Sequence, residues 1–237
     1  MNTPPRALSL DLDDTLWPIW PLIERAERAL DEFLRRHCPR TAERYPISAM
    51  RELRARVATD FPDMAHDFTW QRRYSLGHAL RDSGDDEAHA EAAFEAFFAA
   101  RNRVEFYPDA LPALQRLAAR APIAALTNGN ADLERIGIAG HFHAYVSARG
   151  EGHAKPDTPI FHAACARLGV EPQHVLHIGD DPLLDVVGAR RAGLHSCWIN
   201  RHAHAWPAEL PPPDLEFPTL AALADWLDAN HPHPETA

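Results

Sequence analysis

A short apolar run that ends in three acids, residues 7–16 with the sequence ALSLDLDDTL, constrains this chain most. The carboxylates of Asp11, Asp13 and Asp14 repel one another and resist dehydration, so a fold that gathers them needs a compensating cation or proton. If residues 7–12 form a strand, Asp11 and Asp13 project to the same side where the strand ends. In open parallel α/β sheets, ligands bind at that edge. The run therefore predicts a strand that carries two acids to a binding edge.

The same Asp-Asp-Thr letters also suit a turn or a helix cap, and an acidic cluster is commonly a solvated face. Further polar groups downstream favour the functional interpretation, because each lies near a predicted strand. They are Thr127 after residues 122–126, Lys155 before Pro156-Asp157, Asp180 and Asp181 after residues 174–178, and Asp185 four residues beyond.

Length and composition predict an ordered protein with a sizeable core. The 237 residues are 46% apolar, which allows one large domain or a core with a smaller insert. We find no apolar run near 18 residues and no secretory signal pattern, so we expect no membrane partner and a cytoplasmic location. Three cysteines without metal-site spacing fit reduced thiols.

Charge limits the partners. A net charge of −10 argues against nucleic acid, whose phosphates are bound chiefly by excess Lys and Arg. An anionic substrate then needs local positive charge. Among the 24 basic residues the single lysine is Lys155, within one of the polar motifs. We therefore expect its ammonium to be functional.

The chain changes character twice. Residues 17–106 read as helices with apolar positions at helical spacing, including helices over 70–81 and 86–103 that begin near Asp67 and Asp85. From residue 107 strand and helix patterns alternate, which predicts βαβ units and a parallel sheet. The expected strands are 123–126, 144–148, 175–178 and 196–199. The expected helices are 109–120, 156–168, 183–192 and 219–228, with a helical turn over 130–136. Residues 209–217 read as a loop and residues 231–235 as disordered.

Four motifs in order carry a family resemblance: D-x-D-x-T-L at residues 11–16, T-N-G-N at 127–130, K-P-D at 155–157 and G-D-D-x-x-x-D at 179–185. With them the chain resembles the haloacid dehalogenase (HAD)-like hydrolase superfamily. The resemblance implies a Rossmann-like α/β core with a parallel sheet, built from residues 1–16 and 107–237, and a helical-bundle cap at residues 17–106. The oligomeric state stays open.

The resemblance implies a phosphatase that forms an aspartyl-phosphate. Asp11 is the expected nucleophile, and Asp13 protonates the leaving alkoxide and later accepts a proton from water. Mg²⁺ is the expected cofactor, held by the Asp11 carboxylate, the Asp13 carbonyl and the Asp180 carboxylate. Thr127 and Lys155 complete the catalytic set.

The phosphoryl group is expected to lie among Asp14, Thr127, Asn128 through its backbone amide, and Lys155. For Thr127 and Asn128 the alternative is an ordinary turn. One of Asp181 and Asp185 should support the metal's water shell or pair with Lys155. The alternative for Asp181, before Pro182, is an N-cap.

Asp13 separates two branches of the superfamily. Dehalogenases of the family lack an acid there, because a halide leaves without a proton, so a small phosphorylated metabolite is the expected substrate. A 2-haloacid dehalogenase and a silent phosphate- or partner-binding module remain alternatives.

Further pieces, among them TWQRR at residues 69–73 and CWI at 197–199, resemble cytoplasmic riboflavin-pathway phosphatases acting on 5-amino-6-(5-phosphoribitylamino)uracil and FMN. A flat substrate would stack on Trp17, Trp20, Trp70 and Arg73. For Trp20 and Trp70 the alternative is the core of the bundle.

Overall fold

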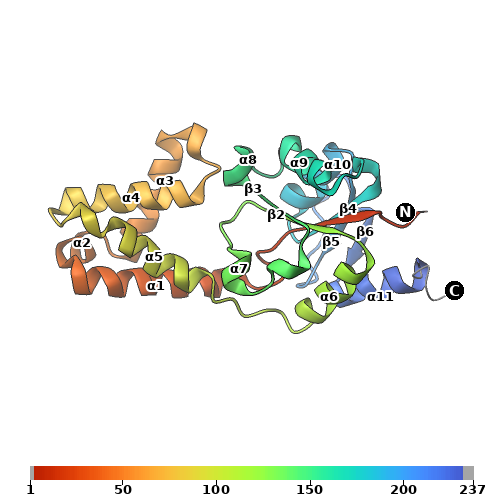
Figure 1. Cartoon of the computed structure of the whole chain (residues 1–237). Coiled ribbons are helices and arrows are strands. Elements are labelled where there is room, and N and C mark those ends of the chain that lie inside the picture. Colours follow the sequence, from red (N-terminus) through yellow and green to blue (C-terminus); the bar gives the residue numbers. More distant parts are fainter. Residues whose placement is uncertain (1–2, 232–237) are drawn as a thin grey trace. The chain divides into compact units, whose positions relative to one another are not determined.

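The computed structural model describes residues 3–231, which form two compact units (Figure 1). Of the described residues, the sheet unit comprises 3–18, 105–129 and 137–231. The helical unit comprises Ile19–Val104 and Asn130–Ile136. Of the expected disordered tail at residues 231–235, all but His231 lies outside the described residues.

Residues 130–136, which we expected in the core, belong to the helical unit. The Asp132 amide donates to Asn102 Oδ1 at 2.8 Å, and Arg135 forms an ion pair with Glu95. Both partners lie in the inserted segment, so these bonds attach α7 (Leu133–Ile136) to the helices. Sequence order alone placed this segment wrongly.

The sheet has six parallel strands in the order β3-β2-β1-β4-β5-β6. They are β1 (Ala7–Leu10), β2 (Ile123–Thr127), β3 (Ala144–Ser147), β4 (Val175–Gly179), β5 (His195–Ile199) and β6 (Leu215–Phe217). Leu8 of β1 pairs with Ile123 of β2 and Leu176 of β4, so the acid-bearing strand is central. The predicted α/β fold with a parallel sheet is confirmed.

Helices cover both faces of this sheet, α9 and α10 on one and α6 and α11 on the other (Figure 1). The helical segments are α6 (Ala110–Arg120), η3 (Ala139–His141), α8 (Ala148–Glu151), α9 (Thr158–Leu168), η4 (Pro172–His174), η5 (Pro182–Val187), α10 (Gly188–Arg191) and α11 (Leu220–Asn230). The helix expected over 183–192 is in fact a π-helical turn, η5, followed by α10.

Strand β6 corrects the expected loop over residues 209–217. Leu215–Phe217 pairs with Cys197–Ile199 of β5. Just before it, the Asp214 carboxylate accepts hydrogen bonds from the Ser196 amide at 2.9 Å and the Ser196 hydroxyl at 3.1 Å. A three-residue edge strand is too short for side-chain alternation to reveal it.

The helical unit has its own apolar core. Its segments are α1 (Ile19–His37), α2 (Pro39–Arg44), α3 (Ile47–Asp60), η1 (Pro62–Met64), α4 (Phe68–Ser83), η2 (Glu87–His89), α5 (Ala90–Arg101) and α7. Leu30 and Leu34 of α1 pack in one cluster with Leu76 and Leu80 of α4 and Phe97 of α5.

The two expected helix starts differ in outcome. The Asp67 carboxylate accepts from the Trp70 amide at 2.9 Å and caps α4. Asp85 caps no helix; its carboxylate accepts from the amide and hydroxyl of Thr41, each at 2.8 Å. It therefore ties α2 to the end of α4 instead.

All three cysteines, Cys38, Cys165 and Cys197, are buried free thiols. Within residues 3–231 no helix is both long and apolar enough to cross a membrane.

Candidate active site

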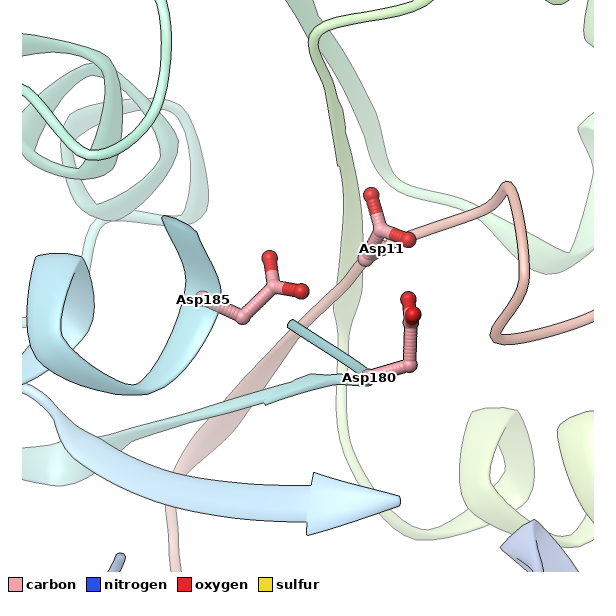
Figure 2. Close-up of side chains that lie close together, drawn as sticks. All are labelled: Asp11, Asp180 and Asp185. Carbon is pink, nitrogen blue, oxygen red and sulfur yellow. The ribbon is translucent and has the colours of Figure 1, made fainter. Parts of the chain in front are cut away.

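The carboxyl ends of three neighbouring strands bring the predicted polar residues together. Asp11 follows β1, Thr127 ends β2 and Asp180 follows β4. The Asp11 amide donates to the Ile178 carbonyl at 2.9 Å, which extends the β1–β4 ladder to the acid itself. Asp11, Asp180 and Asp185 turn their carboxylates toward a common space (Figure 2).

Lys155 is the cation of this cluster. Its buried ammonium donates to Asp11 Oδ1 at 2.5 Å and to Asp185 Oδ1 at 2.6 Å. Burial acts to lower the pKa of Lys155. The charges of Asp11 and Asp185 outweigh this effect and raise the pKa of Lys155 above its ordinary value. Burial likewise acts against ionisation of Asp185, yet Lys155 and His177 hold the pKa of that carboxyl well below its usual range. Lys155 and Asp185 thus form a buried ion pair.

A polar chain through the sheet supports this pair and was missed in the sequence. His177 on β4 contacts Ser9 Oγ of β1 through Nδ1 at 2.8 Å and Asp185 Oδ1 through Nε2 at 3.0 Å. Burial lowers the pKa of His177, against the pull of Asp185. A neutral imidazole with Nε2–H donates to Asp185 while Nδ1 accepts from Ser9. The sequence feature that could have revealed these contacts is a polar residue inside each of two apolar strands, Ser9 in one and His177 in the other.

Close backbone approach makes Gly179 necessary. A Cβ built on Gly179 would lie 2.2 Å from Asp185 Cγ, far inside van der Waals contact. Only glycine lets the Asp185 carboxylate lie against the end of β4. Trp198 also supports this turn, because its indole N–H donates to the Asp180 carbonyl at 2.7 Å.

Thr15 joins the two acids expected to bind metal and was not among the predicted site residues. Its buried hydroxyl lies 3.2 Å from both Asp11 Oδ2 and Asp180 Oδ1. Because one hydroxyl carries one proton, it donates to one of these oxygens at a time. The signal was its place in the first motif, four residues after Asp11.

The acid cluster suits a hard divalent cation. One oxygen from each of Asp11, Asp180 and Asp185 lies within 4.8 Å of the others. Burial raises the pKa of Asp11 to about 7, although Lys155 acts to lower it. Repulsion from Asp185 and Asp13 adds to the effect of burial. Burial and the charges of Asp11 and Asp185 raise the pKa of Asp180 to about 9. Carboxylates that resist ionisation together, in an all-oxygen donor set, fit Mg²⁺.

Asp13 is held by a tryptophan. The Trp17 indole N–H donates to Asp13 Oδ1 at 2.7 Å, and the Trp17 ring is buried edge-on to Phe106. This geometry corrects the expectation that Trp17 stacks on a substrate, because a buried ring offers no open face. Between them Asp14 adopts a left-handed backbone with φ 60°, and its amide donates to the Trp17 carbonyl.

The second motif places Thr127 and Asn128 differently from each other. Thr127 is buried, and its hydroxyl accepts from the Gly129 amide at 2.9 Å. The Asn128 side chain exchanges two hydrogen bonds with the Lys155 backbone, at 2.7 and 2.9 Å. Asn128 therefore fixes the backbone that carries the lysine, a role that its expected backbone contact to phosphate did not include.

The structure distinguishes the two further acids. Asp181 Oδ1 accepts from the amides of Leu183 and Leu184, each at 2.8 Å, so Asp181 is the N-cap of η5. Asp185 pairs with Lys155, and its Oδ2 accepts from the Asp181 amide at 3.0 Å.

The other candidate substrate contacts lie in the helical unit. Trp20 is 68% exposed, which excludes it from the bundle core. Trp70 is half-buried, packs on the core and stacks on Tyr74, as the core alternative anticipated. Arg73 lies over the Phe94 ring at 4.3 Å and pairs with Glu91. Of these side chains, Trp20 alone offers a largely open ring.

Comparison with known proteins agrees with this geometry. The family model of haloacid dehalogenase-like hydrolases matches residues 5–193. The chain is 34% identical to the 5-amino-6-(5-phospho-D-ribitylamino)uracil phosphatase YigB of Escherichia coli K12, covering 93% of this chain and 95% of that protein. It is also 34% identical to the phosphoserine phosphatase of Thermus thermophilus, covering 83% of this chain and 89% of that protein.

Among solved structures, the 2-haloacid dehalogenase of Pseudomonas syringae pv. Tomato DC3000 superposes with a TM-score of 0.88 at 35% identity, covering 94% of this chain and 98% of that one. The motifs, the acid cluster at the sheet edge and these relatives agree on one family. The chain is a hydrolase and belongs to the haloacid dehalogenase-like hydrolase family.

Proposed function

We propose that this hydrolase is a Mg²⁺-dependent phosphatase that cleaves a small phosphate monoester through an aspartyl-phosphate on Asp11. The observation that carries the proposal is the second acid. Asp13 is oriented by the Trp17 N–H, 2.7 Å away, and lies near enough to Asp11 to raise that carboxyl's pKa. An enzyme that must protonate an alkoxide leaving group needs such an acid beside its nucleophile.

The residues divide the reaction into two displacements. A carboxylate oxygen of Asp11 forms a bond to phosphorus while the bond to the leaving oxygen breaks, and Asp13 gives that oxygen its proton. Asp13, now ionised, takes a proton from water as the water oxygen attacks phosphorus. The bond between phosphorus and Asp11 then breaks, which restores both acids.

Charge control comes from the residues around Asp11. Lys155 offers positive charge to the phosphoryl oxygens, and Asp185 and the Asn128 side chain hold it in place. Asp11, the Asp13 carbonyl and Asp180 would hold the metal, with Thr15 orienting the first and last of these. Mg²⁺ bound there would neutralise charge on the phosphoryl oxygens. Thr127 and Asp14 complete the proposed phosphate site.

Two relatives named as phosphatases support a phosphate substrate, but they differ in the substrate that their names give. We propose 5-amino-6-(5-phosphoribitylamino)uracil or FMN, because the YigB relative covers more of the chain. Phosphoserine is the second candidate. The cytoplasmic location remains a prediction.

A dehalogenase is the second candidate function, favoured by the name of the similar Pseudomonas syringae structure. One panel tests both. Purified protein is assayed with Mg²⁺ or with EDTA on FMN, 5-amino-6-(5-phosphoribitylamino)uracil, phosphoserine and sugar phosphates for phosphate release, and on 2-haloacids for halide release. We expect Mg²⁺-dependent phosphate release that Asp11→Asn abolishes in a folded protein. Halide release without phosphate release would establish the dehalogenase.

A further inference from the structure

A hollow inside the helical unit is lined by more positive than negative charge. Helices α1, α3 and α4 and the residues between α2 and α3 line this hollow, which is open to solvent and whose enclosed part has room for about one water molecule. Its charged lining consists of Glu27, Asp31, Arg51, Arg54 and Arg72. The hollow lies wholly within this unit and shares no residue with the acid cluster of the sheet.

Both acids of the lining already have an arginine. Glu27, 5% exposed, accepts from Arg51 Nε at 2.8 Å and also from Arg51 Nη2. Asp31 accepts from Arg35 Nε at 2.6 Å and Nη2 at 3.3 Å. Each carboxylate is therefore held by a two-pronged contact, and neither neutralises the remaining arginines directly.

Arg54 and Arg72 are the arginines left over. Within residues 3–231, neither guanidinium has a hydrogen bond or an ion pair to protein, and neither has a nitrogen that is sealed from solvent without a partner. Arg72 is 7% exposed, and its guanidinium carbon lies 3.4 Å from the centre of the Phe97 ring. The ring attracts the charge but has no oxygen to accept the N–H groups.

The electrostatics agree with this geometry. Burial lowers the pKa of Arg72 well below its ordinary value, and the like charges of Arg54 and Arg101 add to this effect. The charge of Glu27 opposes it. Burial also lowers the pKa of Arg54. Guanidinium groups that stay charged and are crowded together in a partly desolvated hollow favour an anion between them.

We propose that Arg54 and Arg72 form an anion-binding site in the helical unit, which takes the carboxylate or phosphate group of a small ligand. Their planar forks suit either oxyanion, because both groups present two oxygens at matching spacing. Phe97 supports the guanidinium of Arg72 from one side, and an anion would bind at the open mouth of the hollow. The site does not depend on the phosphatase chemistry proposed for the sheet unit.

Inorganic phosphate is the probe, titrated into metal-free full-length protein at constant ionic strength while heat unfolding is followed. We expect a saturable rise in Tm for the wild type, since a ligand that binds the folded state alone stabilises it. Arg72→Met removes the guanidinium but keeps an apolar side chain at this buried position, and should weaken phosphate binding roughly tenfold or more. Arg54→Met, at a half-buried position, should do the same if Arg72→Met fails to fold.

The matched control is Arg135→Met. Arg135 also lies over a phenylalanine, Phe98 at 4.9 Å, but it is paired with Glu95 and outside the hollow. We expect its phosphate response to equal that of the wild type. Crystals grown with selenate should show anomalous density between Arg54 and Arg72. A Tm response unchanged in both methionine variants, or no saturable response in the wild type, would overturn the site.

A second experiment tests whether the anion is part of the substrate or a separate metabolite, and it compares two phosphate esters. Phosphoserine carries a carboxylate that phosphoethanolamine lacks. If the site holds a substituent of the substrate, Arg72→Met raises KM for phosphoserine alone and leaves kcat unchanged. If the site holds a free metabolite, both KM values stay unchanged while phosphate binding is lost. If neither ester is hydrolysed, the Tm response to phosphate still shows whether the anion site exists. A failure of the proposed phosphatase function can therefore be told apart from a failure of the anion site.

Discussion

At the carboxyl edge of the sheet, three acids cluster around one lysine that bonds to only two of them. In the hollow of the helical unit, two arginines remain after each acid has paired with another arginine. Both regions hold charge that the chain itself does not balance. The excess charge is negative at the sheet edge and positive in the hollow. Partly buried charge is costly unless it is paired, so each region favours a ligand of the missing sign. The imbalance at the sheet edge calls for a cation, and that in the hollow calls for an anion.

The largest effect should come from removing the one cation of the acid cluster. Lys155→Met leaves Asp11 and Asp185 buried without their ammonium, which should destabilise the protein by about 3–5 kcal/mol. Activity should fall about 10²–10³-fold or more, because the phosphoryl oxygens lose a charged donor. Urea unfolding and phosphate release measure both.

Arg116→Met is the matched control for lost positive charge. Arg116 pairs with Asp228 on the surface, where the two side chains are 41% and 46% exposed. That change should cost less than about 1 kcal/mol. If Lys155→Met costs no more than this control, the buried pair does not stabilise the fold.

Removing one acid of the cluster should stabilise the metal-free protein, whereas removing the lysine destabilises it. The pKa of Asp180 is raised to about 9, so the folded protein keeps a proton that the unfolded chain loses near pH 4. The contribution of Asp180 therefore lowers the stability of the metal-free protein as pH rises from about 4 toward 9. Asp180→Asn should remove the contribution of Asp180, leave that of Asp11, whose pKa is raised to about 7, and raise stability at pH 8 by about 1–3 kcal/mol.

Magnesium sharpens that result. Mg²⁺ should raise the Tm of the wild type, because an ion that binds only the folded state stabilises it, and should leave Asp180→Asn unchanged. Calorimetry with and without EDTA measures the difference. Equal Mg²⁺ stabilisation of both proteins would remove Asp180 from the metal site.

A smaller effect should follow from the histidine behind the ion pair. His177→Gln disturbs the hydrogen bond that orients Asp185 and should lower activity about 10–100-fold. The pKa of His177 is lowered, so below about pH 6.5 the unfolded chain gains a proton that the folded protein refuses. His177 therefore contributes a loss of stability as the pH falls from about 6.5 to 5, and the stability difference between wild type and variant should change by that contribution over this range.

The control is His78→Gln, an exposed change on α4. It should leave the activity and the slope of stability between pH 5 and 6.5 as they are in the wild type. If His177→Gln also leaves both unchanged, the imidazole does not position Asp185.

The smallest effect concerns the proposed acid and base. Trp17→Phe removes the N–H bond to Asp13 while keeping a ring in the core, and should lower kcat by about tenfold with KM unchanged. Trp226→Phe, at a ring that packs on Phe217 and His231, is the control. A change in KM alone would instead assign Trp17 to substrate binding.

The two regions also differ in how far the sequence predicted them. Asp11, Thr127 and Asp180 were predictable because each follows an apolar strand, and parallel strands bring their carboxyl ends to one edge. Ser9 and His177 were not, because they occupy positions inside strands that read as buried. Their role depends on the register of β1 with β4, in which Ser9 pairs with His177.

The hollow could not be predicted from local pattern at all. Arg72 and Arg73 are neighbours, and the sequence favoured Arg73 for ligand contact. The structure buries Arg72 against Phe97 and leaves Arg73 paired with Glu91 at the surface. Which arginine loses its solvent depends on how α4 turns against α5, and that is set by packing of the whole bundle.

The central claim is that Asp11 carries the phosphoryl group during turnover. The direct measurement is rapid acid quenching of the Mg²⁺-loaded enzyme with a ³²P-labelled phosphate ester, followed by peptide mapping. We expect a labelled peptide that contains residues 7–16, with the label on Asp11 and lost in the presence of EDTA. Steady hydrolysis without any labelled enzyme, or with the label on another residue, would contradict the account.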